Sequence, residues 1–364
     1  MRYKILGRGG LRVSEIALGT MMMGPEEPGR AGPLESRRIM EAYAERGGNF
    51  LDSAPAYNDG QSEKVLGEFV NTDRGRYVVT TKYTNVLYSG IDPRISDDPN
   101  RGGNHKKSMV QSVEGSLRRM NLDYIDLLWL HLWDFSVDIE DVMRAVNDLV
   151  QQGKVLHFGL CNTPGWVVAR GQTAATIRGW EPISALQYQY NLVSRDLELE
   201  LIPCANALGI SVTAFSPLSS GFLTGKYTRD VERESGRLDG GWYTSLEAYS
   251  EQDFVVAKRV DEIADKLGAS SAAVALAWVQ QRGVLPLVGA RTTDQIVDSL
   301  ACLSVELSDE DMDELSQISA TELPWIYNLM QGELSYGIRQ MATGGTLDQL
   351  DNPGFPGLRP VHRV

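Results

Sequence analysis

The sequence predicts an α/β protein, a closed (β/α)8 barrel of the TIM type with an N-terminal β-hairpin cap and long loops at its C-terminal face. Two observations predict this fold. Short apolar runs rich in β-forming residues alternate with longer segments of helical periodicity, which is typical of a parallel sheet with helical crossovers. Eight such repeats fall within about 300 residues, which favours a closed barrel over an open sheet.

The predicted strands are residues 16–18, 49–52, 77–81, 125–130, 157–160, 185–188, 211–215 and 285–288. Helical candidates between them include residues 35–46, 62–70, 108–120, 139–151, 197–208 and 271–282. The last of these carries a broad apolar face, and Gly283 is placed to end it.

A doubly wound dinucleotide-binding fold is the alternative architecture. The clustered glycines near the start of the chain are Gly7, Gly9 and Gly10, and the residues after them do not form a helical pattern. The strand–GxGxxG–helix context is therefore missing. We interpret residues 3–6 and 11–14 as a two-stranded hairpin that caps one end of the barrel.

Three segments depart from the plain repeat. Residues 84–107 and 227–252 are long, irregular and follow predicted strands, where barrel enzymes build their sites. The chain after Pro324 loses its periodicity towards the end. We therefore predict a barrel domain over residues 1–323 and a C-terminal extension over 324–364, a helix followed by an extended or mobile arm.

Composition narrows the class of protein. The chain has 364 residues and a formal net charge of −13, which argues against nucleic acid or an anionic membrane as a partner. Its apolar runs are shorter than a membrane helix needs, and its N-terminus does not resemble a signal peptide. The cysteines Cys161, Cys204 and Cys302 are widely spaced, as expected of thiols in a reducing compartment. We expect a cytoplasmic enzyme; its oligomeric state stays open.

Polar side chains follow three of the predicted strands at the point where each strand ends. Asp52 ends the second run, with Tyr57 five residues later; Lys82 follows the third run and His131 the fourth. Taken singly, each has an ordinary structural explanation, such as a turn residue or a buried histidine. The catalytic residues of barrel enzymes gather at strand ends, so we expect these four to converge at one mouth.

These four residues suit the reduction of a carbonyl group, which needs a hydride on carbon and a proton on oxygen. Tyr57 supplies the proton, and the ammonium of Lys82 stabilises the phenolate that remains. Asp52 holds the charge of Lys82 in place, and His131 donates a hydrogen bond to the carbonyl oxygen. With four scattered histidines and no metal-binding motif, we expect no metal.

Eight segments carry a resemblance to a known family: residues 18–20, 49–57, 81–82, 123–131, 153–162, 187–191, 215–226 and 289–295. In these segments the sequence is similar to the aldo-keto reductase superfamily, over roughly residues 1–320. The family's catalytic tetrad falls on Asp52, Tyr57, Lys82 and His131 without substitution. The resemblance implies a reductase that uses NADP(H) on a small-molecule aldehyde or ketone. Because some relatives serve as channel subunits, a nicotinamide-binding regulatory or scaffold subunit is the alternative.

The resemblance also implies a cofactor site. Asn162 and Gln187 would hold the nicotinamide amide, with Phe215 stacked on its ring where many relatives have tyrosine. Ser299 stands where asparagine is common near the adenine, so adenine contacts would differ. The remaining expected ligands line the ribose, the pyrophosphate or the adenosine end: Gly19, Thr20, Asp52, Ser216, Leu218, Gly221, Lys226, Gly289, Arg291, Gln295 and Asp298.

Arg291 is the residue that we expect to favour NADPH over NADH. It precedes a helix whose N-terminal N–H groups attract anions, and its guanidinium matches the oxygens of a 2′-phosphate, with Gln295 one turn away. The expected walls of the substrate pocket are apolar or aromatic and point to an apolar carbonyl compound: Met22, Met23, Tyr57, Trp129, Trp133, Phe222 and Trp242.

Overall fold

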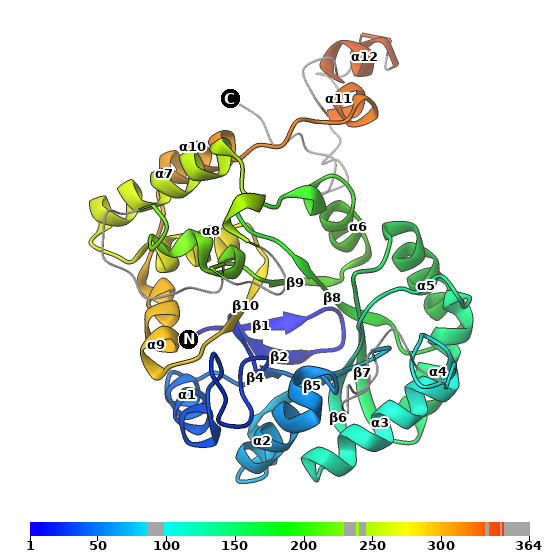
Figure 1. Ribbon diagram of the computed structural model, residues 1–364. Coiled ribbons are helices and arrows are strands. Elements are labelled where there is room, and N and C mark those ends of the chain that lie inside the picture. The colour runs from blue at the N-terminus through cyan, green and yellow to red at the C-terminus, as the bar shows by residue number, and fades with distance from the viewer. Residues whose placement is uncertain (86–97, 229–237, 240–244, 332–334, 343, 346–364) are drawn as a thin grey trace.

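The computed structural model describes residues 1–85, 98–228, 238–239, 245–331, 335–342 and 344–345. Within them, eight parallel strands close into a barrel in the order β10-β3-β4-β5-β6-β7-β8-β9 (Figure 1). All eight predicted runs form strands of this barrel. The barrel strands are β3 (Ala17–Gly19), β4 (Phe50–Asp52), β5 (Val78–Tyr83), β6 (Ile125–Leu130), β7 (Val155–Cys161), β8 (Ile183–Gln189), β9 (Ser211–Phe215) and β10 (Leu285–Gly289).

Helices surround the barrel and cover its outer surface (Figure 1). They are α1 (Pro33–Glu45), α2 (Gln61–Val70), α3 (Lys106–Met120), α4 (Ile139–Gln151), α5 (Gly165–Arg178), α6 (Leu201–Leu208), α7 (Glu251–Leu267), α8 (Ser271–Gln281), α9 (Thr293–Leu300) and α10 (Asp309–Ile318). The helix expected over residues 197–208 begins late, at Leu201, because a 3-10 turn at Asp196–Glu198 precedes it. Helices α5 and α7 have no counterpart among the helical segments predicted from the sequence.

The predicted hairpin is present and plugs the N-terminal end of the barrel. Strands β1 (Tyr3–Leu6) and β2 (Leu11–Ser14) pair in antiparallel register. In the turn, the Gly7 N–H donates to Ser211 Oγ at 2.9 Å. Gly7 has a φ of 59°, and a Cβ atom there would lie 2.5 Å from the backbone oxygen of Ser184, so this close approach requires glycine.

Two apolar layers hold the fold together. The smaller layer fills the barrel interior, where Leu6 and Val13 of the hairpin join inward-facing strand residues such as Phe50, Leu127 and Trp129. The larger layer lies between the strands and the helices and includes every apolar residue on the buried face of α4. A barrel packed on both faces holds its strand ends in fixed positions, which is what a catalytic mouth needs.

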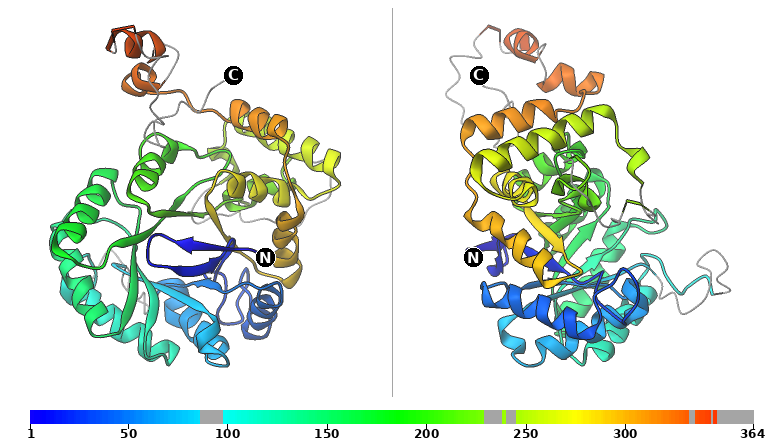
Figure 2. Two further views of the ribbon diagram at one scale, coloured as in Figure 1. Left: turned by 180° about the vertical axis from the view of Figure 1, so that it is seen from behind. Right: turned by 60° about the vertical axis from the view of Figure 1, so that its left-hand side comes forward.

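The chain continues beyond the barrel in two short helices, α11 (Trp325–Gln331) and α12 (Ser335–Ala342). Both views in Figure 2 place them past α10, outside the ring of helices, and Trp325 is 76% exposed. The division between residues 323 and 324 stays a prediction. None of the described helices combines the length and the apolar character needed to cross a bilayer.

Candidate active site

The carboxyl ends of β4, β5 and β6 bring together the four residues predicted to be catalytic. Asp52 is the last residue of β4, and Lys82 lies near the end of the neighbouring strand β5. His131 directly follows β6, and Tyr57 begins the turn that leaves β4. The parallel register of three adjacent strands therefore delivers all four side chains to one mouth.

Asp52 and Lys82 form an ion pair, and each residue is only 1% exposed. The Lys82 ammonium donates to Asp52 Oδ2 and, at 2.9 Å, to the backbone oxygen of Ser53. Asp52 Oδ1 accepts hydrogen bonds from Thr80 Oγ1 at 2.7 Å and from Gln187 Nε2 at 3.1 Å. Burial acts to lower the pKa of Lys82, but Asp52, Tyr57 and Cys161 together outweigh it, so the pKa is raised and Lys82 stays charged.

The phenol of Tyr57 lies against this ion pair. Lys82 Nζ is 5.0 Å from the centre of the Tyr57 ring. Desolvation raises the pKa of Tyr57, and the positive charge of Lys82 acts in the opposite direction. Tyr57 is therefore protonated at neutral pH and has beside it a cation that stabilises the phenolate. This arrangement can deliver a proton.

His131 also lies close to Tyr57, with ring centres 6.1 Å apart and planes at 84°. Burial, together with the nearby charge of Lys82, lowers the pKa of His131 to about 3, so the imidazole is neutral at neutral pH. The side-chain amide of Asn85 lies 3.2 Å from His131 Nδ1. The amide nitrogen is a donor only, which makes Nδ1 the acceptor and leaves the ring proton on Nε2. His131 can therefore donate from Nε2.

Asn162 and Gln187, the predicted nicotinamide ligands, both contact members of this group. Asn162 Nδ2 donates to the backbone oxygen of His131 at 3.1 Å, from a backbone with a φ of 44°. A left-handed asparagine is a mildly strained conformation that turns its side chain back over the mouth. Because Gln187 donates from Nε2 to Asp52, its Oε1 remains an acceptor that a carboxamide can use.

The loop after β9 has an unusual backbone. Ser216, Ser219, Ser220 and Gly221 have φ values of 49°, 49°, 56° and 91°. Asn191 Nδ2 holds the start of the loop through a 2.9 Å bond to the Ser216 oxygen. Backbone hydrogen bonds close the turns that these residues form, since the Ser219 N–H donates to the Ser216 oxygen and the Gly221 N–H to the Leu218 oxygen, each at 2.9 Å.

Lys226 adds a cation to this loop. A Cβ atom on Gly221 would lie 2.9 Å from Lys226 Nζ, so glycine leaves the space that the ammonium occupies. The predicted pyrophosphate ligands Ser216, Gly221 and Lys226 therefore share one loop in which a positive charge lies over the backbone.

Comparison with known proteins gives the family. The model of the aldo/keto reductase family matches residues 15–320. The chain belongs to the aldo/keto reductase family.

Relatives of this aldo/keto reductase include three fungal proteins. The aryl-alcohol dehydrogenase (NADP(+)) of Phanerodontia chrysosporium is 33% identical over 359 residues, covering 94% of this chain and 92% of its own. The aldo-keto reductase ausK of Emericella nidulans is 33% identical over 346 residues, with coverages of 90% and 84%. The norsolorinic acid reductase stcV of the same species is 34% identical over 313 residues, with coverages of 84% and 78%. Together they support an oxidoreductase that acts on a small molecule.

Internal hydrogen bonds hold the start of α9, where we predict that a phosphate binds. Thr292 caps the helix by accepting from the Gln295 N–H, and the Arg291 N–H donates to Gln295 Oε1 at 2.9 Å. Glu35 of α1 accepts from Thr293 N at 2.6 Å and from its hydroxyl at 2.8 Å. These bonds to Thr293 lower the pKa of Glu35, so a carboxylate already lies on this helix N-terminus.

The other predicted adenosine ligands and ribose ligands differ in exposure. Gly289, Gln295 and Asp298 are exposed. Ser299 is 4% exposed, so its side chain lies on the buried face of α9. Thr20 is buried and bonded through its N–H and hydroxyl to the Asp52 oxygen, and Gly19 is half-buried beside it. The half-buried residues Phe215 and Leu218 lie at the loop after β9.

The structure corrects part of the predicted substrate pocket. Met23, Trp129 and Phe222 have no exposed surface. Phe222 instead stacks on Tyr249 with ring centres 3.9 Å apart. These three are core residues. Met22 keeps part of its surface exposed, Trp133 is 5% exposed, and Trp242 lies outside the described residues.

Sequence reasoning missed several residues at the mouth. Leu132 and Phe135, in the loop after His131, are 49% and 71% exposed, and Met21 after β3 is 36% exposed. Phe135 has a φ of 59° and its ring meets Trp133 edge-on at 6.4 Å. Their signal was available, since each is an apolar residue within four positions of a predicted site residue. The amide of Asn85 that orients His131 gave no such signal.

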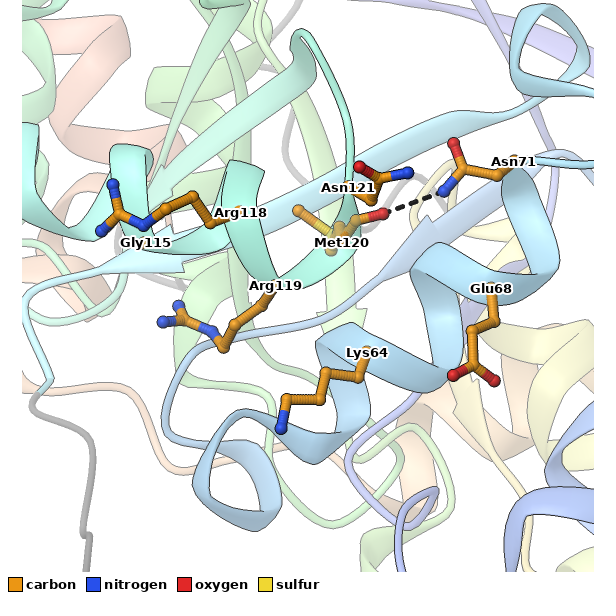
Figure 3. A pocket seen from close by; sticks show the side chains of 8 residues that line it. All are labelled: Lys64, Glu68, Asn71, Gly115, Arg118, Arg119, Met120 and Asn121. Carbon is orange, nitrogen blue, oxygen red and sulfur yellow. Dashed lines mark hydrogen bonds between the residues drawn. The ribbon is translucent and has the colours of Figure 1, made fainter.

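A separate surface groove lies between α2 and α3 (Figure 3). Arg118, Arg119 and Lys64 extend along it, and Asn71 Nδ2 donates to the Met120 oxygen at 3.0 Å. None of the described residues that we predicted for the site lines this groove, so the chemistry of the barrel mouth does not involve it.

Proposed function

We propose that this protein reduces an aldehyde or ketone to an alcohol with NADPH, and that Tyr57 is the general acid. The observation that carries the proposal is the arrangement of Asp52, Lys82, Tyr57 and His131 at one mouth. A buried ion pair places a permanent cation beside a protonated phenol, and a neutral imidazole with Nε2 as its donor nitrogen faces that phenol.

Each side chain has a distinct task in this proposal. His131 donates from Nε2 to the carbonyl oxygen and orients it. Tyr57 transfers its proton to the same oxygen as negative charge develops there. Lys82 stabilises the phenolate that remains, and Asp52 holds Lys82 in position and charged. When bound, the nicotinamide supplies the hydride that the carbonyl carbon receives.

The residues around the mouth fit a nicotinamide dinucleotide phosphate. Asn162 and Gln187 offer amide groups beside the catalytic residues for the carboxamide. The loop after β9 offers a glycine, Gly221, at which a phosphate can approach the backbone closely, and a cation, Lys226, for the pyrophosphate. Arg291 at the start of α9 offers a guanidinium for the 2′-phosphate. This set of donors supports NADP(H) as the cofactor.

The substrate in this proposal is an apolar, aromatic carbonyl compound. Met21, Leu132 and Phe135 present exposed apolar surface on the loops that border His131 and β3. Exposed aromatic and aliphatic side chains grouped around polar catalytic groups are typical of small-molecule sites.

The three cysteines are unpaired, which supports a reducing compartment such as the cytoplasm.

A simple experiment tests the proposed function. The purified protein is mixed with NADPH and an aromatic aldehyde, and the absorbance at about 340 nm is followed, with Tyr57→Phe as the matched control. We expect turnover by the wild type and a loss of at least 100-fold in the variant, the scale of general acid catalysis. Tight NADPH binding without turnover in the wild type would instead support a regulatory or scaffold subunit.

A further inference from the structure

A chain of hydrogen bonds connects the packed interior of the barrel to the catalytic ion pair. The indole nitrogen of Trp129, on β6, donates to Thr80 Oγ1 at 3.0 Å. Thr80, on β5, is in turn 2.7 Å from Asp52 Oδ1, and Lys82 donates to the other oxygen of the same carboxylate. Trp129 and Thr80 have no exposed surface, and Asp52 and Lys82 are 1% exposed, so water does not compete for these bonds.

The direction of this chain follows from the donor groups. An indole N–H can only donate, so Thr80 Oγ1 accepts from Trp129. A threonine hydroxyl has a single hydrogen, and the Asp52 carboxylate can only accept. The hydrogen of Thr80 therefore points to Asp52, and the acceptance from Trp129 holds it there. In the reverse orientation both Trp129 and Asp52 would lose a partner in a buried site.

We propose that Thr80 and Trp129 are positioning residues for the reaction, acting through Asp52 to hold the Lys82 ammonium beside Tyr57. The inference rests on the proposed function and deepens it. Lys82 has a long, flexible stem, and its place depends on where the Asp52 carboxylate is held. Asp52 Oδ1 accepts from two donors, Thr80 and Gln187, and Thr80 is itself held by a buried donor, the Trp129 indole.

A third strand makes room for this arrangement. Trp129 lies opposite Gly159 of β7 in the parallel register. A Cβ atom on Gly159 would lie 2.4 Å from two carbons of the indole, Cε3 and Cζ3. The absence of a side chain on Gly159 therefore lets the indole lie close to β7, in the position from which its nitrogen reaches Thr80.

The decisive variant is Thr80→Val, which has nearly the same shape and lacks the hydroxyl. The charged or titratable groups that face Tyr57 are Lys82, Asp52, Cys161 and His131. Loss of one donor concentrates negative charge on Asp52, which acts on Tyr57 to raise its pKa. We expect kcat to fall about 10-fold, the scale of one hydrogen bond to a charged group, with KM nearly unchanged. The apparent pKa in the pH profile of alcohol oxidation should rise by roughly half a unit.

Two variants control for loss of packing. Thr80→Ser keeps the hydroxyl and should recover most of the wild-type rate and pH profile. Thr81→Val removes the hydroxyl of the next residue, which faces the other side of the sheet and bonds to Glu63 at 2.6 Å. It should lower the melting temperature about as much as Thr80→Val and leave the pH profile in place.

Trp129→Phe completes a double-mutant cycle. Because the indole acts through the Thr80 hydroxyl, Trp129→Phe should shift the same pH profile, and the double variant should lose no more activity than Thr80→Val alone. Additive losses, or a Thr80→Val enzyme that is less stable but keeps its kcat and apparent pKa, would overturn the inference. Tyrosinate absorbance during a pH titration, taken as the difference from Tyr57→Phe, reports the same shift without turnover. A wild type that shows no turnover would count against the proposed function instead.

Discussion

The ammonium of Lys82 lies 5.0 Å from the centre of the Tyr57 ring and forms an ion pair with the buried carboxylate of Asp52. The phenol therefore lies beside a cation that has its own buried counter-ion. Two opposing influences act on Tyr57, since desolvation keeps its proton on and Lys82 stabilises its loss. This balance makes the phenol both stable as an acid and able to transfer its proton.

Replacement of Tyr57 tests the acid directly. Tyr57→Phe should lower kcat for aldehyde reduction by at least about 100-fold, because it removes the phenol that lies beside the Lys82 ammonium. The dissociation constant for NADPH, measured by fluorescence titration, should change little. A variant that turns over at a near-normal rate would remove Tyr57 from this role.

Replacement of Lys82 should affect both activity and stability. Lys82→Met leaves Asp52 buried without its counter-charge, and breaking a buried pair in this way costs about 3–5 kcal/mol. The double variant Asp52→Asn with Lys82→Met removes the orphaned charge and should regain part of the free energy of unfolding, measured in urea. Both variants should be nearly inactive. If Lys82→Met folds normally and stays active at neutral pH, the phenol is not activated by Lys82.

The half-buried, neutral imidazole of His131 predicts how the stability and activity of the enzyme respond to acid. The pKa of His131 is lowered to about 3 in the folded protein, against about 6.5 in an unfolded chain. Between these values the unfolded chain binds more protons, so this residue makes the fold less stable as the pH falls from 6.5 towards 3. The rate of carbonyl reduction should therefore show no histidine limb near pH 6.5.

Unfolding experiments check the same residue. The free energy of unfolding in urea should fall more between pH 7 and pH 5 in the wild type than in His131→Gln, which cannot be protonated. An equal fall in the two proteins would show that His131 does not carry this pH dependence. A rate profile with a limb near pH 6.5 in the wild type would contradict the neutral, Nε2-protonated form.

Cofactor preference should depend on Arg291. Arg291→Ala is expected to weaken NADPH binding by about 1.5–3 kcal/mol, as for a hydrogen bond to a charged group, and to spare NADH, which lacks the 2′-phosphate. Arg37→Ala is a matched control, because Arg37 is an exposed arginine paired with Glu41 on α1. Dissociation constants for both cofactors decide the matter, and equal losses for NADPH and NADH would reject Arg291.

The carboxylate of Glu35 makes a second, opposite change at the same helix. Glu35 occupies the Thr293 N–H at the start of α9, where its charge opposes that of an incoming phosphate. Glu35→Gln keeps an acceptor for Thr293 and removes the charge. It should tighten NADPH severalfold, on the order of the 0.3–1 kcal/mol typical of a charge at a helix end, and leave NADH nearly unchanged. A decrease in NADPH affinity would contradict this reading.

The barrel, and the convergence of the predicted catalytic residues at its mouth, were predictable because strand ends are visible in the sequence. Apolar runs that end in Asp52, Lys82 and His131 mark the carboxyl end of each strand, and parallel pairing then places those ends together. The depth of a residue inside the barrel was not predictable. Trp129 precedes His131 by two positions and points to the same side of β6, but it lies one layer deeper, where it packs against Gly159.

Contacts between distant segments account for the other differences. Phe222 was predicted to be a pocket wall, and it stacks instead on Tyr249, a residue within the long irregular segment 227–252. The hydrogen bond from Asn85 to His131 joins two loops whose approach depends on the closed barrel. Glu35 meets Thr293 only because the first and last strands of the barrel are neighbours. Such pairs have no pattern in the sequence.

The hairpin formed by β1 and β2 has a consequence for how ligands bind and dissociate. It closes one end of the barrel, where Leu6 and Val13 join the interior packing, so the site at the mouth is open at the other end only. In the proposed function, the dinucleotide and the carbonyl compound would then both enter and leave through the C-terminal mouth of the barrel. The ligand that binds deeper would bind first and dissociate last. Slow dissociation of that ligand would then limit the turnover rate.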